Sequence, residues 1–138
     1  MSAQGKPVLS FDLLLANGFT AVAKWTYCPV NGIKLDSSVS KSEGVYAFAV
    51  DGTVLYIGVA TRSFATRMSG YCKPGPTQST NKRLKVNILD ALERGCTVDV
   101  CLAMPCDFEW HDLPVRGASG LEFGLIKNFS LPWNKQGK

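Results

Sequence analysis

The chain has 138 residues, of which 46% are hydrophobic. A chain of this length can bury the core of one domain but not the cores of two independent ones. Fifteen lysines and arginines against eleven aspartates and glutamates give a formal charge of +4, which suits an anionic partner without requiring one.

The sequence shows neither a membrane span nor a secretory signal. No segment approaches the roughly 18 apolar residues of a spanning helix, and residues 1–9 are polar. We therefore expect a cytoplasmic protein without membrane association. The five cysteines are odd in number and form no Cys-x-x-Cys pair, which disfavours a disulfide framework and a zinc site. Reduced thiols, buried or half-buried, are expected instead.

Residues 1–42 predict an N-terminal extension made of a short helix and a strand. Residues 10–17 are apolar enough for the helix, and residues 19–27 alternate loosely as the strand. Residues 29–43 are rich in Gly, Ser, Asp and Lys, and this composition predicts a connector on the surface.

A β-hairpin is the clearest local prediction. Residues 45–50 and 54–58 are two β-rich runs joined through Asp51-Gly52, a dipeptide that favours a tight hairpin turn. Beyond the hairpin, four residues spaced at i, i+3, i+4 and i+7 predict one face of a helix. These residues are Phe64, Arg67, Met68 and Tyr71.

The next segment predicts a loop, a helix and a strand in turn. Residues 72–79 are expected to form an irregular loop, and Thr80 to cap a helix that Gly95 ends. In residues 97–104, large apolar side chains alternate with smaller or polar ones, which predicts a half-buried strand ended by Pro105. The buried side of that strand is expected to hold Val98, Val100, Leu102 and Met104.

The last part of the chain predicts a loop and a helix. Residues 106–116 are expected to be a loop with two aromatic residues, and residues 120–129 a helix that ends before Pro132. The only histidine, His111, lies in this loop without a second histidine nearby, so a catalytic or ligand role is not expected.

Four pieces of sequence occur in an order that resembles the GIY-YIG endonuclease family. They are Gly44-Val45-Tyr46, then Tyr56-Ile57-Gly58, then the helical Arg67, and finally Glu122 followed by Leu125-Ile126 and Pro132-Trp133-Asn134. The resemblance covers residues 44–134. It implies an α+β fold, a small central antiparallel or mixed β-sheet flanked by helices, in a nuclease-like domain over residues 43–138.

The resemblance also implies a site and a reaction. Glu122 would hold one Mg²⁺, which Mn²⁺ could replace, and Arg67 would clamp the phosphate oxygens with its planar fork. Tyr56 or Tyr46 would activate the attacking water. Tyr71 and Asn134 would complete the cluster. Where the family often has Lys after the second motif, this chain has Val59.

Structural roles compete with each of these assignments. Tyr46 and Tyr56 could simply pack in the core, because Tyr is common in strands. Glu122 follows Ser119 at the spacing of a capping box, in which the glutamate bonds the first backbone amide of the helix. Asn134 could satisfy backbone groups near the end of the chain.

The substrate implied by the resemblance is DNA, expected to be double-stranded. Candidate DNA contacts are basic and amide side chains on the loops and helix starts after the second motif, namely Arg62, Lys73, Asn81, Lys82, Arg83 and Lys85. No separate DNA-reading domain is visible, so specificity is left to loops, the extension or a homodimer. The alternatives are a DNA-binding module that has lost turnover, a structure-specific repair nuclease, and a structural or protein-interaction domain.

Overall fold

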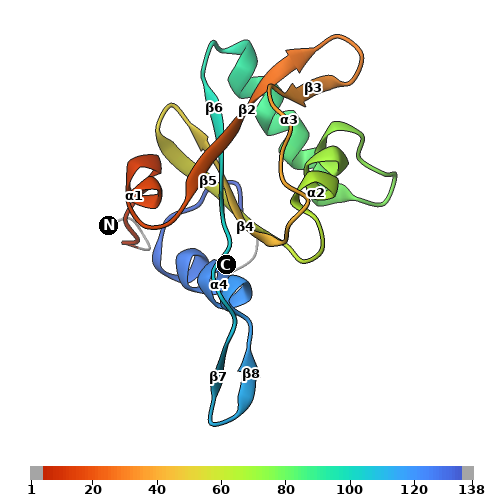
Figure 1. Cartoon of the computed structure of the whole chain (residues 1–138). Helices are drawn as coiled ribbons and strands as arrows, with labels where there is room; N and C mark the ends of the chain where they lie inside the picture. Colours follow the sequence, from red (N-terminus) through yellow and green to blue (C-terminus); the bar gives the residue numbers. More distant parts are fainter. Residues whose placement is uncertain (1–4, 135–138) are drawn as a thin grey trace.

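The computed structural model describes residues 5–134 (Figure 1). Six strands form one antiparallel sheet with the order β1-β5-β4-β6-β2-β3. Helices lie on both faces of this sheet, which confirms the expected α+β class. The strands are β1 (Leu9–Ser10), β2 (Thr20–Cys28), β3 (Gly32–Leu35), β4 (Gly44–Val50), β5 (Thr53–Ala60) and β6 (Val98–Ala103).

The sheet separates the core into two halves, and two helices cover each half. Helices α2 (Phe64–Cys72) and α3 (Ser79–Glu93) pack on one face, and α1 (Phe11–Leu15) and α4 (Gly117–Asn128) pack on the other. The two clusters meet back to back at β4, whose residues 44–49 are all buried. Because successive side chains of a strand point to opposite faces, β4 supplies both clusters.

The predicted hairpin is confirmed as the pair β4 and β5. Its turn residues, Asp51 and Gly52, have φ of 49° and 89°, the left-handed backbone that a tight two-residue hairpin turn requires. The predicted helix after the hairpin is confirmed as α2, and its residues Phe64, Met68 and Tyr71 are buried.

Two segments that were expected to be loops contain strands. The connector predicted at 29–43 includes β3, which pairs with β2, so the sheet extends past the polar composition of this stretch. The loop predicted at 106–116 is a second hairpin, made of β7 (Phe108–Trp110) and β8 (Leu113–Val115). Three-residue strands give too short an alternation for the sequence pattern to show them.

The prediction of a half-buried strand at 97–104 was wrong in one respect. Both faces of β6 are covered, since Cys101 and Ala103 are buried as well as the expected Val98, Val100 and Leu102. The reason is that β6 lies in the middle of the sheet, between β4 and β2, with helices on either face. Met104 lies just beyond the strand and is 61% exposed.

Helix starts and one cysteine also differ from expectation. The N-cap position of α3 is Gln78 rather than Thr80, and no side chain caps this end. Helix α4 begins three residues earlier than expected, at Gly117. Cys106 is exposed, whereas Cys101 is buried and the other three cysteines are half-buried and free.

Residues before the first motif are part of the same sheet. Strand β1 pairs with β5, and β2 pairs with β6. Trp25 of β2 is 1% exposed and makes edge-on contacts with Phe48 and Tyr71, with ring centroids 5.9 Å and 6.4 Å away. Among residues 5–134, no helix is long and apolar enough to cross a membrane.

Because Trp25 joins β2 to the core beneath α2, Trp25→Ala is expected to lower the free energy of unfolding by about 3–5 kcal/mol. Urea unfolding followed by circular dichroism measures this change. The control is Tyr27→Ala on the same strand, which removes a side chain that is 66% exposed and should cost less than about 0.5 kcal/mol. Equal costs for the two variants would show that β2 is not anchored through Trp25.

Candidate active site

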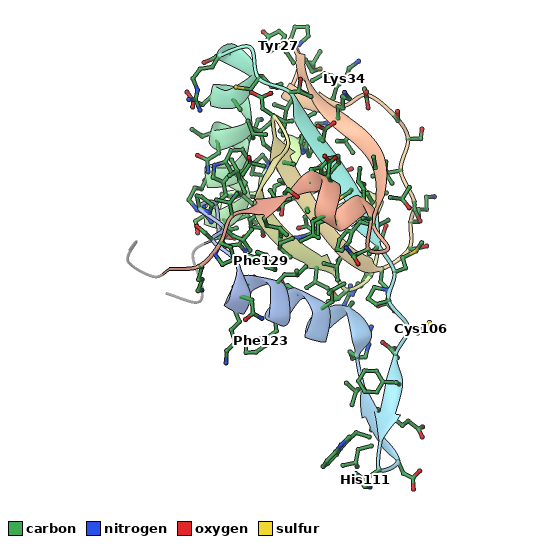
Figure 2. All side chains as sticks on the ribbon, turned by 90° about the vertical axis from the view of Figure 1, so that its left-hand side faces the viewer. Tyr27, Lys34, Cys106, His111, Phe123 and Phe129 are labelled. Atoms are coloured by element: carbon green, nitrogen blue, oxygen red, sulfur yellow. The ribbon has the colours of Figure 1, made fainter. Side chains whose placement is uncertain are left out.

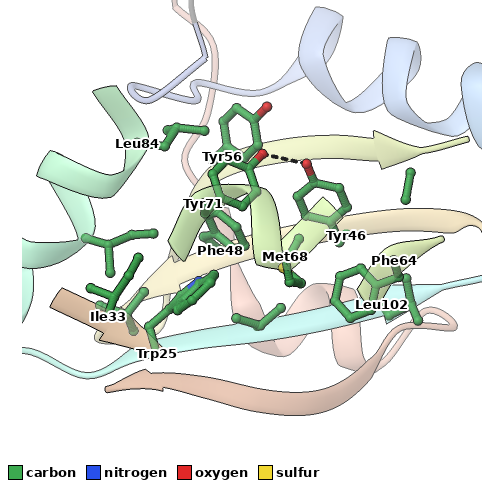
Figure 3. Packing of buried hydrophobic residues seen from close by; sticks show 14 of the residues in the cluster. Trp25, Ile33, Tyr46, Phe48, Tyr56, Phe64, Met68, Tyr71, Leu84 and Leu102 are labelled. Carbon is green, nitrogen blue, oxygen red and sulfur yellow. Dashed lines mark hydrogen bonds between the residues drawn. The ribbon is translucent and has the colours of Figure 1, made fainter. Parts of the chain in front are cut away.

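Two tyrosines and an arginine form a hydrogen-bonded cluster on the α2–α3 face of the sheet. The hydroxyls of Tyr46 and Tyr71 lie 2.6 Å apart, and either one can be the donor (Figure 3). The Nε of Arg67 donates to the Tyr46 hydroxyl at 3.0 Å. The Arg67 guanidinium also lies over the ring of Tyr71, 5.4 Å from its centroid, in a cation–π arrangement.

Local sequence accounts for this meeting. Tyr46 points to the α2–α3 face because it is two residues before Phe48 on β4, and both belong to the same core cluster. Arg67 and Tyr71 are four residues apart on α2 and so lie on one stripe of the helix. The predicted sharing of one helical face is therefore confirmed.

The start of α2 is fixed by serines that the sequence motifs did not single out. The Ser63 side chain caps the helix by accepting from the backbone amide of Thr66 at 3.2 Å. The carbonyls of Ser42 and Ser40 accept from the next amides, at Phe64 and Ala65. A Ser before an apolar helical run is an N-cap signal, so the role of Ser63 was open to prediction. The carbonyl contacts were not.

Gly58 gives the tyrosines room. A Cβ at this position would come within 2.6 Å of the Tyr46 hydroxyl and 2.9 Å of the Tyr56 ring. The third residue of the second motif therefore has a packing reason to be glycine, since any side chain would displace one of the two rings.

Tyr56 lies beside the hydrogen-bonded cluster without joining it. Its ring centroid is 6.2 Å from that of Tyr46 and 5.6 Å from that of Phe48. The side chain is 6% exposed, and its hydroxyl makes no hydrogen bond with another residue in the part of the chain that the structure describes. Figure 3 shows this hydroxyl turned to the same side as the Tyr46–Tyr71 pair.

Burial determines the charge state of the two bonded tyrosines. It raises the pKa of Tyr46 well above its ordinary value, and the neighbouring Arg67 only partly opposes this effect. Burial raises the pKa of Tyr71 further still. Both phenols are therefore neutral around pH 7 and act as hydrogen-bonding groups.

Glu122 approaches Arg67 from a different element. Its half-buried carboxyl has a pKa raised by burial, and the Arg67 guanidinium lowers that pKa. Helix α4 packs against β4 and β5 from the opposite face of the sheet. The outer edge of β5 leaves a path between the two faces, along which the Glu122 and Arg67 side chains can interact. Strand β1 pairs only with residues 53 and 54 of β5, and no described strand follows this edge beyond them.

The capping-box alternative for Glu122 was wrong. Helix α4 begins at Gly117 with Arg116 at the N-cap position, so Ser119 lies inside the helix and does not cap its start. Glu122 is in the second turn, beyond reach of the first backbone amide. Its carboxylate is thus available to the side of the sheet edge where Arg67 lies.

Asn134 clamps the backbone of β5. Its side-chain oxygen accepts from the Ile57 amide at 3.0 Å, and its side-chain nitrogen donates to the Ile57 carbonyl at 2.9 Å. The neighbouring Trp133 amide donates to the Leu55 carbonyl at 2.8 Å, and Arg83 of α3 donates to the Trp133 carbonyl at 2.8 Å. The backbone role that was the alternative for Asn134 is therefore present, at the residue before Gly58.

The six candidate DNA contacts differ in how far they are buried. Asn81 is 4% exposed and donates to the Gly70 carbonyl and to Gln78, so its assignment as a DNA contact was wrong. Side-chain exposure could not be judged from its place near a helix start. Arg83 and Lys85 are half-buried and donate to the carbonyls of Trp133 and Cys72. Lys82 donates to the Pro76 carbonyl but is exposed, as are Arg62 and Lys73.

A metal site at this position would have one protein carboxylate. Within residues 5–134 no group of three or more His, Cys, Asp or Glu side chains could hold a metal ion. A single carboxylate nonetheless fits Mg²⁺, which keeps several waters and commonly binds one or two carboxylates together with substrate phosphate oxygens. It does not fit zinc, which takes three or four protein ligands.

The α+β fold agrees with the one that the resemblance to the GIY-YIG family implied. The structure is similar to one of bacteriophage T4 EndoII in which a glutamate is replaced by alanine, with a TM-score of 0.72 and 22% identity over 90% of this chain and 97% of that one. EndoII is a GIY-YIG-type endonuclease. No family model and no curated protein matches the sequence.

The neutral, bonded tyrosines make the fold sensitive to alkali. An unfolded tyrosine ionises near pH 10, while Tyr46 and Tyr71 keep their protons in the folded state. The unfolded chain then binds fewer protons, so the free energy of unfolding should fall as the pH rises above about 10. Urea unfolding at a series of pH values measures this fall.

The variant with Tyr46→Phe and Tyr71→Phe should show a smaller fall, because it lacks both phenols. Tyr27→Phe, at a side chain that is 66% exposed, is the control and should behave as the unmodified protein does. The same pH dependence in the double variant as in the unmodified protein would contradict the assignment.

Proposed function

We propose that the protein is a metal-dependent endonuclease that hydrolyses phosphodiester bonds of DNA. The observation that carries this proposal is the approach of a carboxylate and a guanidinium from opposite faces of the sheet, Glu122 on α4 and Arg67 on α2. Phosphodiester cleavage requires positively charged groups beside the non-bridging oxygens and beside the leaving oxygen. The guanidinium would supply the first, and a cation held by the carboxylate would supply the second.

Glu122 would hold the cation, Mg²⁺ or in its place Mn²⁺. When bound, the cation acts as a Lewis acid on the phosphoryl and leaving oxygens. The raised pKa of Glu122 reflects the cost of burying its charge, and a cation would relieve this cost. The Arg67 guanidinium, which lowers that pKa, already offsets part of this cost.

Arg67 would hold the phosphate. Its Nε is occupied by the Tyr46 hydroxyl, which leaves the two terminal nitrogens of the fork to donate to non-bridging oxygens. The half-buried position strengthens such contacts relative to water. Tyr46 and Tyr71 would act as positioning residues, because they fix the guanidinium plane from its edge and from its face.

Tyr56 is favoured over Tyr46 as the group that orients and deprotonates the attacking water. The Tyr46 hydroxyl is already bonded to two partners and its pKa is raised by burial, so it is a poor base. The Tyr56 hydroxyl is free of such bonds within the described residues and lies on the same side. Asn134 would hold the backbone on which Tyr56 and Gly58 are placed.

The proposed substrate is double-stranded DNA, and the proposed role is that of a stand-alone or restriction-like nuclease. The proposed location of the protein is the cytoplasm. The fold shared with EndoII, an endonuclease, supports this choice. The positive charge of the chain and the exposed side chains Arg62, Lys73 and Lys82 support contact with phosphates. Residues 43–138 would form the nuclease-like unit, and the preceding extension would complete its sheet.

The alternative is a DNA-binding module that retains the fold without turnover. Val59, half-buried after the second motif, is the observation that favours it, because it leaves no ammonium group at this position. The two functions differ in whether DNA is cleaved when a divalent cation is present.

Glu122→Gln and Arg67→Lys are each expected to lower the rate of Mg²⁺-dependent plasmid nicking by at least about 10²-fold, because each removes charge stabilisation from the reacting phosphate. Gel electrophoresis of supercoiled plasmid measures the rate. The matched controls are Glu93→Gln and Arg94→Lys, exposed residues at the far end of α3, which should nick at the unmodified rate.

One further result would contradict the nuclease activity, and another would contradict the role of Glu122. DNA band shifts that weaken with salt but produce no nicks in the unmodified protein would identify the binding module. Nicking that survives the Glu122 substitution would remove this residue from the site.

A further inference from the structure

The hairpin formed by β7 and β8 projects from the body of the protein. Figure 1 shows both strands extending below α4, away from the six-stranded sheet, and Figure 2 shows the same from a second side, with His111 at the far tip. The two strands pair only with each other. A two-stranded hairpin of this kind is marginally stable in water without a further partner.

One face of this hairpin is entirely apolar. The pairs are Phe108 with Val115 and Trp110 with Leu113, and these four side chains share a face because residues two apart on a strand point the same way. The other face carries the pair Glu109 and Pro114. Phe108, Trp110 and Leu113 are 58%, 63% and 58% exposed, so the body of the protein leaves this face largely uncovered.

The base of the hairpin is held firmly to the body. Arg116 pairs with Asp107 at 3.2 Å and with Glu43 at 2.6 Å, joining the hairpin to the segment just before β4. The Asp107 carboxylate also accepts from the Gly117 amide at 2.9 Å, at the start of α4. These contacts join the base of the β7–β8 hairpin, called the arm below, to the body of the protein.

The charge of the arm argues against DNA as its partner. Residues 107–115 include Asp107, Glu109 and Asp112 and contain no Lys or Arg. Asp107 is paired with Arg116 at the base, and the other two carboxylates on this projecting element oppose contact with phosphates, whether of nucleic acid or of an anionic membrane. Glu109 lies on the opposite face from Trp110, so a protein surface can cover the apolar face while this carboxylate stays in water.

The area of the apolar face matches what pairing with an identical face needs. The exposed parts of Phe108, Trp110 and Leu113 amount to about 350 Å², the size of the largest apolar patch on a typical monomer. Two such faces together would bury about 700 Å² of apolar surface. Homodimer interfaces are about 65% apolar, so the total would be about 1,100 Å², close to the lower end of the range for specific complexes.

We propose that the apolar face of the β7–β8 hairpin binds the same face of a second copy of this chain, about a two-fold axis. A two-fold contact is self-complementary, so one apolar face is sufficient to close a dimer without leaving a second surface open. The dimer places two copies of the candidate site in one particle. Cleavage of both strands by that particle rests on the proposed function, but the dimer itself does not.

The mass of the protein in solution, without DNA or divalent cation, tests the dimer separately from the nuclease. Sedimentation equilibrium of the unmodified chain, from nanomolar to high micromolar concentration, is expected to show a mass that rises from the chain mass of 15.0 kDa to twice that value. Trp110 should also become buried on association, which shifts its fluorescence emission to shorter wavelength as concentration rises. A monomer at every concentration would overturn the proposal.

The variants locate the contact. Phe108→Ser with Trp110→Ser should give a monomer, and so should Leu113→Arg, which leaves both aromatic residues in place and inserts a charge into the contact. The matched control is Tyr27→Ser, equally exposed at the opposite end of the molecule, and it should remain dimeric (Figure 2). Dimers in both hairpin variants would overturn the proposal. So would loss of DNA binding by variants whose mass is unchanged, since the arm would then contact DNA.

Discussion

The hydrogen bond from the Arg67 Nε to the Tyr46 hydroxyl connects the two halves of the candidate site. Tyr46 is on a central strand of the sheet and Arg67 is on the helix that covers it, so this bond fixes the position of the guanidinium on α2 relative to β4. Tyr71 bonds the same hydroxyl and lies beneath the guanidinium. A charged group is thus held half-buried in a hydrophobic core without being left unpaired, which would otherwise be costly.

That arrangement depends on empty space as much as on contacts. Gly58 has no side chain where one would meet the Tyr46 hydroxyl, and β5 has no described neighbouring strand along most of its outer edge. Asn134 and Trp133 occupy part of this edge by bonding its backbone. The remaining opening lets Glu122 of α4 come under the influence of Arg67, although the two helices pack on opposite faces.

Local patterns were enough to predict the parts of the site that are close in sequence. The turn dipeptide Asp51-Gly52 predicted the β4–β5 hairpin, and the four-residue spacing predicted that Arg67 and Tyr71 share a face. Whether Glu122 caps its helix or faces the site could not be decided, because the answer depends on where α4 begins. The structure starts α4 at Gly117, set by the Asp107 contact to its first amide.

Other parts of the structure have weaker signals in the amino-acid sequence and were not predicted from it. The β7–β8 hairpin turns at His111 and Asp112, both with positive φ, instead of the Gly or Asn that usually mark such a turn. Asn81 looked like a surface amide at a helix start but is buried by packing between α2 and α3, where it donates to the Gly70 carbonyl. The covering of both faces of β6 depends on its place in the sheet order, which no local pattern reports.

The central claim is that Glu122 and Arg67 share one site around the edge of β5, and the pKa of the Glu122 carboxyl tests it most directly. Carbon NMR of the side-chain carboxyls during a pH titration gives this value, with Glu122→Gln to assign the signal among four glutamates. Arg67→Met should raise the pKa of Glu122, because the guanidinium that lowers it is removed, whereas Arg62→Met should leave it unchanged. An unchanged pKa in the Arg67 variant would contradict the account.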